Sequence, residues 1–146
     1  MYSLARTAIA IFLVAVAVNY PWELAQAPLF RWPSQGQGVW WHCFFAALGD
    51  GFITLLIFAA GWAAQRRQDW FAQPGTSGYV VMLITGLVIA AVVEWVAVHL
   101  LWRWSYSALM PLVPLLDIGI VSLAQMLVLP PLIFRAAGTW LYRRSK

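Results

Sequence analysis

Four long apolar stretches alternate with short polar segments along this chain of 146 residues. The apolar stretches cover about residues 7–30, 39–64, 79–102 and 115–142. Each is long enough to cross a bilayer as an α-helix, which takes ~20 residues. The pattern therefore predicts an all-α polytopic membrane protein, folded as a single domain with a bundle of four transmembrane helices.

The first stretch has a second interpretation, as a signal peptide. Its apolar run includes Ala15-Val16-Ala17, which fits a cleavage site of small residues. Because the apolar character continues past that site to Phe30, we favour a full transmembrane span.

Proline and glycine indicate where the helices bend and end. Pro21 should kink the first helix, and Pro28 should help to end it. The segment 73–78 has strong turn chemistry between the second and third helices. Pro130 and Pro131 lie inside the fourth apolar stretch, where they should bend or divide the helix because each lacks a backbone N–H.

The composition indicates that lipid is the solvent of this chain. Hydrophobic residues make up 63% of the sequence and charged residues only 10%, whereas a soluble domain carries about 25% charged residues. The net charge of +4 comes mostly from cations between and after the apolar runs. Since these cations form no basic patch on a soluble surface, we exclude nucleic-acid binding.

The distribution of cations predicts how the chain lies in the membrane. Four spans place both termini on one side, and that side receives most of the cations: Arg6, Arg66, Arg67, Arg143, Arg144 and Lys146, with Arg135 nearby. Only Arg31 and Arg103 fall opposite. The positive-inside rule then predicts a multi-pass protein of the bacterial inner (cytoplasmic) membrane with both termini cytoplasmic. We interpret most tryptophans, Trp70 among them, as interfacial belts and only Trp95 as deeper.

Ionisable groups are few and unevenly placed. Four of the five carboxylates fall within or at the edge of a predicted span: Glu23, Asp50, Glu94 and Asp117. A charge there costs ~3 kcal/mol on insertion scales. Helical rise places Asp50 ~15 Å below Trp40 and Glu94 ~12 Å below Trp102. All intramembrane ionisable groups therefore fall at the midplane or in the outer half.

We interpret this asymmetry as a pocket that opens toward the outer leaflet. Asp50 and Glu94 are the candidate catalytic pair, because two acids at similar depth share a proton and can serve as a general acid. The alternative is a protonated carboxyl group that only links two helices by a hydrogen bond. Seven further residues are candidate binding residues: Glu23, His42, His99, Arg103, Tyr106, Asp117 and Gln125.

Helical geometry limits which of these groups can meet. Glu94 and His99 are five residues apart, ~140° around a helix, so they cannot point at one centre without distortion. His99 and Arg103 share a face. Arg103 is a candidate contact for an anionic group of a ligand, or an ion-pair partner for Glu23 or Asp117. Alternatively, its side chain extends to the membrane surface, as arginines at helix ends commonly do.

Metal binding has little support in the sequence. No tight ligand spacing such as Glu-x-x-His occurs, so we assign no metal ligand, and the cofactor is undetermined. Cys43, the only cysteine, has apolar neighbours and is interpreted as a small packing residue. Gly49 and Gly51 flank Asp50 and should allow another helix to approach closely.

Several residue strings carry a family resemblance. They are the segment 22–30, His42-Cys43 with Gly49-Asp50, Glu94-Trp95, the segment 103–106 with Met110-Pro111, and Gln125 with Leu129-Pro130. Together they resemble small bacterial four-helix integral membrane proteins, a resemblance that covers most of the chain and implies no activity. Pro21-Trp22-Glu23 is similar to the Pro-x-Glu-acid motif of membrane-embedded lycopene cyclase domains. Leu24 replaces the second acid, so cyclase activity is not carried over.

Three functions fit these features. The first is a pocket that binds or processes a lipid or isoprenoid-like molecule, with the bilayer as the partner of the helices. The second is an accessory or assembly subunit of a larger membrane complex. The third is a small proton-coupled carrier that works as a homo-oligomer. Whether the chain is an enzyme is left open by the sequence.

Overall fold

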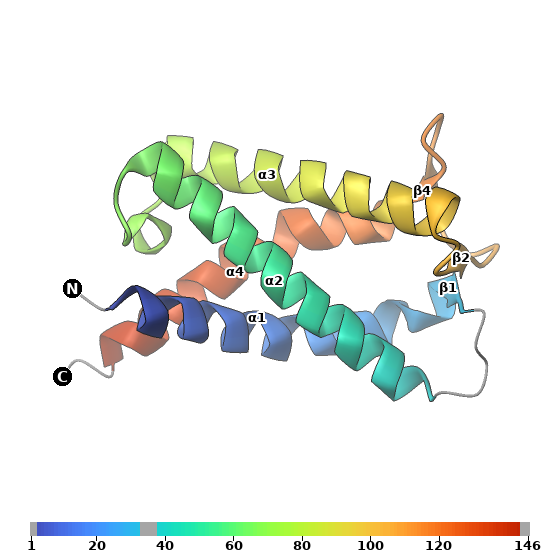
Figure 1. Cartoon of the computed structure of the whole chain (residues 1–146), viewed down its shortest axis with the longest axis horizontal. Coiled ribbons are helices and arrows are strands. Elements are labelled where there is room, and N and C mark those ends of the chain that lie inside the picture. The colour runs from blue at the N-terminus through green and yellow to red at the C-terminus, as the bar shows by residue number, and fades with distance from the viewer. Residues whose placement is uncertain (1–2, 33–37, 144–146) are drawn as a thin grey trace.

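Four long helices run the length of the molecule (Figure 1). The computed structural model describes residues 3–32 and 38–143. The helices are α1 (Leu4–Gln26), α2 (Val39–Gln65), α3 (Gly75–Trp95) and α4 (Ile120–Arg143). All four, with α1 extended to Leu29 and α3 to Leu100, are long and apolar enough to cross a membrane. The predicted all-α fold with four candidate transmembrane helices is confirmed.

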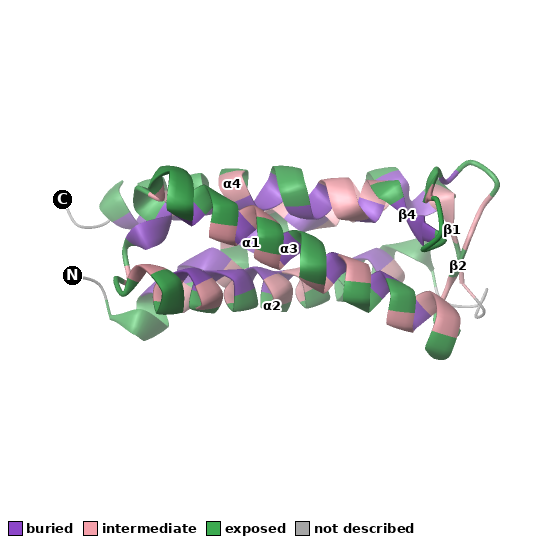
Figure 2. Cartoon of the chain, turned by 90° about the horizontal axis from the view of Figure 1, so that it is seen from above, coloured by how far each residue is buried: buried purple, intermediate pink, exposed green. Residues whose placement is uncertain are grey.

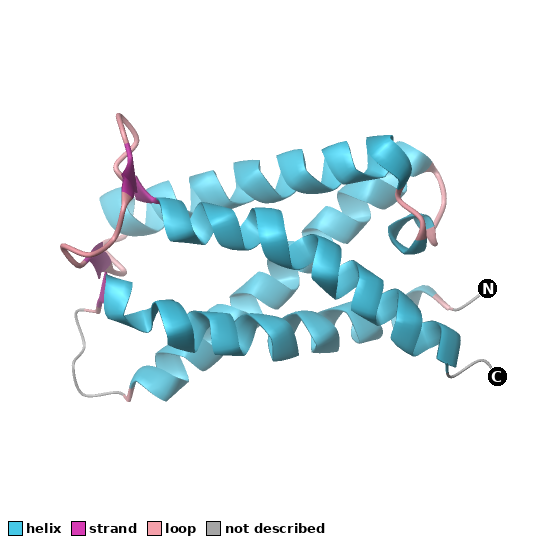
Figure 3. Ribbon diagram, turned by 180° about the vertical axis from the view of Figure 1, so that it is seen from behind, coloured by secondary structure: helices cyan, strands magenta, loops and turns pink. Residues whose placement is uncertain are grey.

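Short elements connect the helices. They are two 3-10 turns, η1 (Ala27–Leu29) and η2 (Trp70–Ala72), one π-helix, η3 (Val96–Leu100), and four strands, β1 (Phe30–Arg31), β2 (Ser105–Tyr106), β3 (Leu112–Val113) and β4 (Ile118–Gly119). Strand β1 pairs antiparallel with β2, and β3 with β4. The strands gather at one end, here called the strand end, and the chain termini lie at the other, the terminal end (Figure 3).

The fourth helix begins later than hydropathy predicted. It starts at Ile120, because residues 112–119 form the β3–β4 hairpin. Leu115 and Asp117 have φ values of 73° and 49°, and such left-handed backbone interrupts a right-handed helix. Asp117 is therefore an exposed loop residue, and its predicted position inside the fourth span is wrong.

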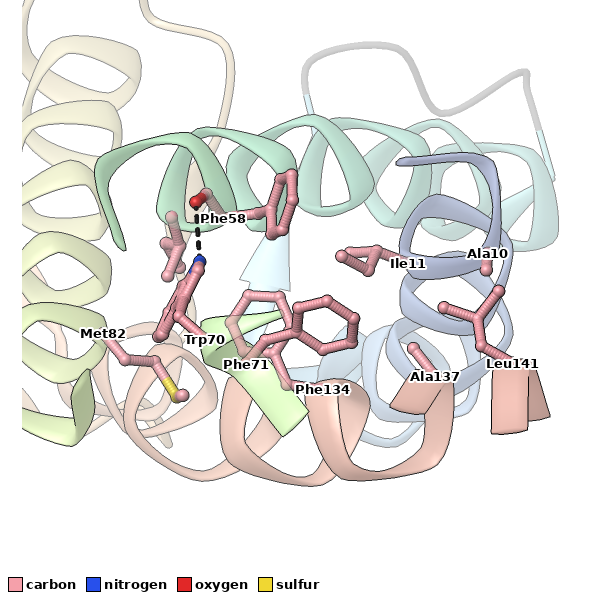
Figure 4. Packing of buried hydrophobic residues seen from close by; sticks show 10 residues of the cluster. Ala10, Ile11, Phe58, Trp70, Phe71, Met82, Phe134, Ala137 and Leu141 are labelled. Atoms are coloured by element: carbon pink, nitrogen blue, oxygen red, sulfur yellow. Dashed lines mark hydrogen bonds between the residues drawn. The ribbon is translucent and has the colours of Figure 1, made fainter. Parts of the chain in front are cut away.

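An apolar core fills the terminal half of the bundle (Figure 4). The core contains Ala10, Ile11, Ile57, Phe58, Trp70, Phe71, Met82, Phe134, Ala137 and Leu141. Turn η2 folds back so that Trp70 is fully buried, with Nε1 donating to the Phe58 carbonyl at 3.1 Å. The interfacial role predicted for Trp70 is therefore wrong. Figure 2 shows that buried residues of the helices face one another, while exposed residues lie along the outer faces.

Glycines let the helices approach one another. A Cβ atom at Gly51 of α2 would lie 2.8 Å from the Phe12 ring of α1, whereas one at Gly49 would meet nothing within 4 Å. The predicted close helix approach is therefore confirmed for Gly51 and wrong for Gly49. Helix α4 continues through Pro130, which cannot donate to the Met126 carbonyl one turn earlier. A Cβ atom at Gly86 of α3 would lie 2.9 Å from that oxygen. Gly86 thus lets α3 pack against the carbonyl that the proline frees.

Candidate functional site

A cavity of about 860 Å³ lies in the strand half of the bundle and receives polar side chains from all four helices. They are Glu23 and Gln26 of α1, Asp50 of α2, Glu94 of α3, and Ser122 and Gln125 of α4. Small-molecule sites in proteins span roughly 300 to 1,000 Å³. The cavity is therefore large enough for a small amphiphilic ligand.

Gln125 is the centre of a hydrogen-bond network in the wall of this cavity. Its Nε2 atom lies 2.8 Å from Asn19 Oδ1, 2.9 Å from Glu23 Oε1 and 2.8 Å from Asp50 Oδ2. A primary amide nitrogen carries two hydrogens. Gln125 therefore cannot donate to all three acceptors at once.

Gln26 forms the second layer of the network. Its Nε2 lies 2.7 Å from Glu23 Oε1 and 3.0 Å from Gln125 Oε1, and its own Oε1 accepts from the Trp22 indole at 3.2 Å. Asn19 donates to the Ala15 carbonyl at 2.9 Å, which turns Asn19 Oδ1 toward Gln125. We call Asn19, Glu23, Gln26, Asp50 and Gln125 the amide–acid cluster.

The carboxyl groups of Glu23 and Asp50 meet at Gln125, whose Nε2 atom lies within 2.9 Å of one oxygen of each. Asp50 was predicted to pair with Glu94, and the structure instead gives it Glu23 as its partner. Helices α1 and α2 also approach closely at Gly51, where an added Cβ atom would meet Phe12 and Val16 of α1.

Glu94 is held separately, on the opposite side of the cavity from α1. It is 8% exposed, and its Oε2 accepts from Tyr106 Oη and from Trp104 Nε1 at 3.4 Å. Burial, and then the hydrogen bond to Glu94, raise the pKa of Tyr106, so its hydroxyl stays a donor. Strand β2 positions Tyr106, since its pairing with β1 sets Tyr106 opposite Phe30.

Two hydrogen-bonding atoms near Glu94 have no partner in the described part of the chain. The Ser122 hydroxyl is buried beside Glu94, and its Oγ has no hydrogen-bond partner among the described residues. Both donors to Glu94 bind Oε2, and Oε1 accepts no hydrogen bond from the residues described. These two oxygens can receive a ligand.

Arg103 and His42 lie at the mouth of the cavity. Both line it, and the His42 ring is 5.2 Å from that of Trp32. The one ion pair between described residues joins Arg67 and Asp69 at 3.9 Å. Arg103 is therefore not paired with Glu23 or Asp117, the two partners considered from the sequence.

His99, predicted as a binding residue, is not among the residues that line this cavity. It follows Glu94 on the π-helix, and its Nδ1 lies 3.1 Å from the Trp95 carbonyl oxygen. Its ring stacks on that of Trp95, which is 42% exposed on the outer face. The predicted separation of Glu94 and His99 onto different faces is confirmed. Asp117 also lies outside the lining, in the β3–β4 loop.

The polar side chains of the site are arranged for hydrogen bonding and are not clustered as metal ligands. Between residues 3–32 and 38–143, no group of three His, Cys, Asp or Glu side chains comes close enough to hold a metal ion. Cys43 is buried, with Sγ 3.4 Å from the Glu23 carbonyl oxygen. Its predicted role as a packing residue is confirmed.

Sequence reasoning missed four residues of the site: Asn19, Gln26, Trp104 and Ser122. A signal for the first two exists, because Asn19, Glu23 and Gln26 follow the i, i+4, i+7 spacing of one helix face. Trp104 was assigned to an interfacial belt, and only the fold directs its indole N–H to Glu94. Ser122 lies within the predicted fourth span, and only the packing of α4 against the other helices shows that it lines the cavity.

Comparison of the chain with models of known protein families, with curated proteins and with solved structures finds no match. Function must therefore be argued from the cavity and the groups that line it.

Proposed function

We propose that this chain is an integral membrane protein whose cavity binds or processes a lipid or isoprenoid-like molecule. The observation that carries the proposal is the convergence of polar groups from four helices on one cavity of about 860 Å³. Burying a carboxyl group in a membrane costs several kcal/mol. Three such groups around one cavity, in a bundle whose other half is apolar, favour a ligand site over simple helix packing.

The ligand would enter from the leaflet that faces the strand end. Arg6, Arg66, Arg67 and Arg143 lie at the terminal end of the bundle, which by the positive-inside rule belongs in the cytoplasm. In a bacterial inner membrane the cavity would then open to the outer leaflet. A lipid could reach it by lateral diffusion.

Proton donation is the chemistry that the amide–acid cluster supports. Gln125 holds the carboxyl groups of Glu23 and Asp50 together at the cavity wall, and two acids at such a place would share a proton. Asp50 would act as the general acid toward a polar group or double bond of the ligand. Glu94, oriented by Tyr106 and Trp104, would stabilise positive charge on the ligand.

The apolar core weighs against the carrier alternative. A proton-coupled carrier needs polar groups along a path to both sides of the membrane. The terminal half is instead packed with large apolar side chains, including Phe58, Trp70 and Phe134.

The test uses the purified chain in vesicles of bacterial lipid extract. Lipids that stay bound, and any product formed, are identified by mass spectrometry for the wild type, Asp50→Asn and Glu94→Gln. The control is Asp69→Asn, which changes an exposed acid in the α2–α3 connection. We expect the two cavity variants to lose the bound lipid or its conversion while the control keeps both. Folded cavity variants that retain both would overturn the proposal.

A further inference from the structure

The charges that line the cavity are unbalanced. Glu23, Asp50 and Glu94 contribute carboxyl groups, while Arg103 is the lining arginine, and it is exposed at the mouth. Glu23 and Asp50 form one acidic group around Gln125 Nε2. Glu94 adds a second acidic group, buried at 8% exposure. The interior of the cavity therefore favours a positively charged group over an anion.

An aromatic wall leads to Glu94. We give this name to Phe30, Trp32 and Trp104, which all line the cavity. The Phe30 ring centroid lies 6.2 Å from that of Trp32 and 6.4 Å from that of Trp104. Trp104 in turn donates to Glu94 at 3.4 Å. Aromatic faces attract cations within about 6 Å of the ring centroid, so this wall offers a second source of attraction for a positive group.

Two side-chain oxygens near Trp104, one on Ser122 and one on Glu94, are available for further hydrogen bonds. Ser122 is 7% exposed, and its buried Oγ has no hydrogen-bond partner among residues 3–32 and 38–143. Oε1 of the neighbouring Glu94 accepts no hydrogen bond from the described residues. A group that carries several N–H donors would satisfy both oxygens, and a primary ammonium has three N–H donors and no acceptor.

We infer that the cavity takes the ammonium group of a cationic or zwitterionic amphiphile, held between Glu94, Ser122 and the aromatic wall. This inference rests on the proposed function and names the class of its ligand. The apolar part of the lining, which includes Phe45, Ile53, Val93 and Met126, receives the hydrocarbon chain. Arg103 at the mouth can contact the phosphate of a zwitterionic head group.

Three single-chain probes test the inference: tetradecylammonium, tetradecyl phosphate and tetradecanol, which share one hydrocarbon chain. Their binding to the full chain in a neutral glycoside detergent is measured by native mass spectrometry. We expect tetradecylammonium to bind at a ratio of one to one, and about tenfold more tightly than the alcohol, since the charged contacts are worth roughly 1 to 3 kcal/mol.

Variants identify the groups responsible. Glu94→Gln should weaken tetradecylammonium binding about tenfold, and Ser122→Ala, which removes only a hydroxyl, should weaken it severalfold. Asp69→Asn is the matched control and should change nothing. Arg103→Gln should leave ammonium binding intact or strengthen it, because it removes the positive charge at the mouth.

The outcomes separate this inference from the proposed function. If none of the three probes binds to folded protein, both are overturned. If the phosphate or the alcohol binds best, or if ammonium binding is unchanged in both Glu94→Gln and Ser122→Ala, the ammonium inference alone is overturned.

Discussion

Gln125 links polar groups from three helices at a single atom. Its Nε2 is within 2.9 Å of oxygens on Asn19, Glu23 and Asp50, so it links α4 to α1 and α2 within the bundle. Because there is little water in such a site, each acceptor that loses its donor keeps most of its desolvation cost. The network should therefore be sensitive to the loss of this one amide.

Replacing Gln125 with leucine should destabilise the protein by about 3 kcal/mol, since the two hydrogens of its amide no longer reach the buried acceptors around it. Thermal unfolding in detergent measures the loss. The control is Gln73→Leu, at an exposed side chain in the α2–α3 connection. Equal melting temperatures for the two variants would contradict the central role given to Gln125.

Tyr106 gives a prediction about pH. Its pKa is raised above the ordinary value of 10.0 by burial and by Glu94, so the native state favours the protonated hydroxyl. The stability that this hydroxyl contributes is complete below pH 10.0 and is lost as the pH rises through the raised pKa. Tyr106→Phe should therefore unfold more easily than the wild type at pH 8, by about 1 kcal/mol, and the difference should shrink at pH 11.

The exposed Tyr79 supplies the control for this pH series. Tyr79→Phe should track the wild type at both pH values. A stability difference between Tyr106→Phe and the wild type that stays constant from pH 8 to pH 11 would count against the Tyr106–Glu94 hydrogen bond.

At the scale of the element, turn η2 is the part of the fold that most departs from a simple helical hairpin. It places the Trp70 ring against Gly61 of α2, where an added Cβ atom would lie 2.0 Å from the ring. Trp70 also closes the apolar core by packing on Phe134, with ring centroids 5.4 Å apart. The α2–α3 connection thus covers the apolar core at the terminal end of the bundle.

Two glycine substitutions on α2 test this packing. Gly61→Ala should cost about 1 to 3 kcal/mol, because the rigid indole cannot move aside cheaply. Gly49→Ala has no atom within 4 Å of the added Cβ and should gain up to about 1 kcal/mol from the better helix propensity of alanine. Unfolding curves that shift alike for both variants would show that Trp70 does not fill the space beside Gly61.

Hydropathy predicted the helices well and their connections poorly. The four helices follow from apolar stretches that are long enough to cross a membrane, and α2, predicted as 39–64, is Val39–Gln65. The apolar run 115–142 began too early because Leu115, Leu116 and Ile118 are as apolar in a hairpin as in a helix. Trp70 was misplaced because a tryptophan beside charged residues looks interfacial until tertiary contacts bury it.

The sequence predicted which residues form the candidate site better than it predicted which of them contact one another. Asp50, Glu94, Glu23 and Gln125 were identified because polar residues are costly in apolar spans. The Glu23–Asp50 contact could not be predicted, since it depends on how α1 rotates against Gly51. The hydrogen bond from Tyr106 to Glu94 depends on the β1–β2 pairing, for which two-residue strands leave no pattern in the sequence.

At the scale of the whole molecule, one half is an apolar core and the other a polar cavity. Arginines at the terminal end predict that both termini face the cytoplasm. A fluorescent protein fused after Lys146 should therefore fluoresce in bacterial cells, and alkaline phosphatase fused there should be inactive. The opposite result with both reporters would reverse the predicted orientation and place the cavity in the inner leaflet.

The most direct test of the account is whether blocking the cavity expels its ligand. Gly49 lines the cavity and has open space where a side chain would begin, so Gly49→Leu should fill the cavity without disturbing the helices. Ala63→Leu adds the same bulk at an exposed position of the same helix and serves as the control. Native mass spectrometry of protein purified from membranes should find a bound amphiphile on the wild type and on Ala63→Leu, and none on Gly49→Leu. Equal occupancy in all three proteins would contradict a ligand site in this cavity.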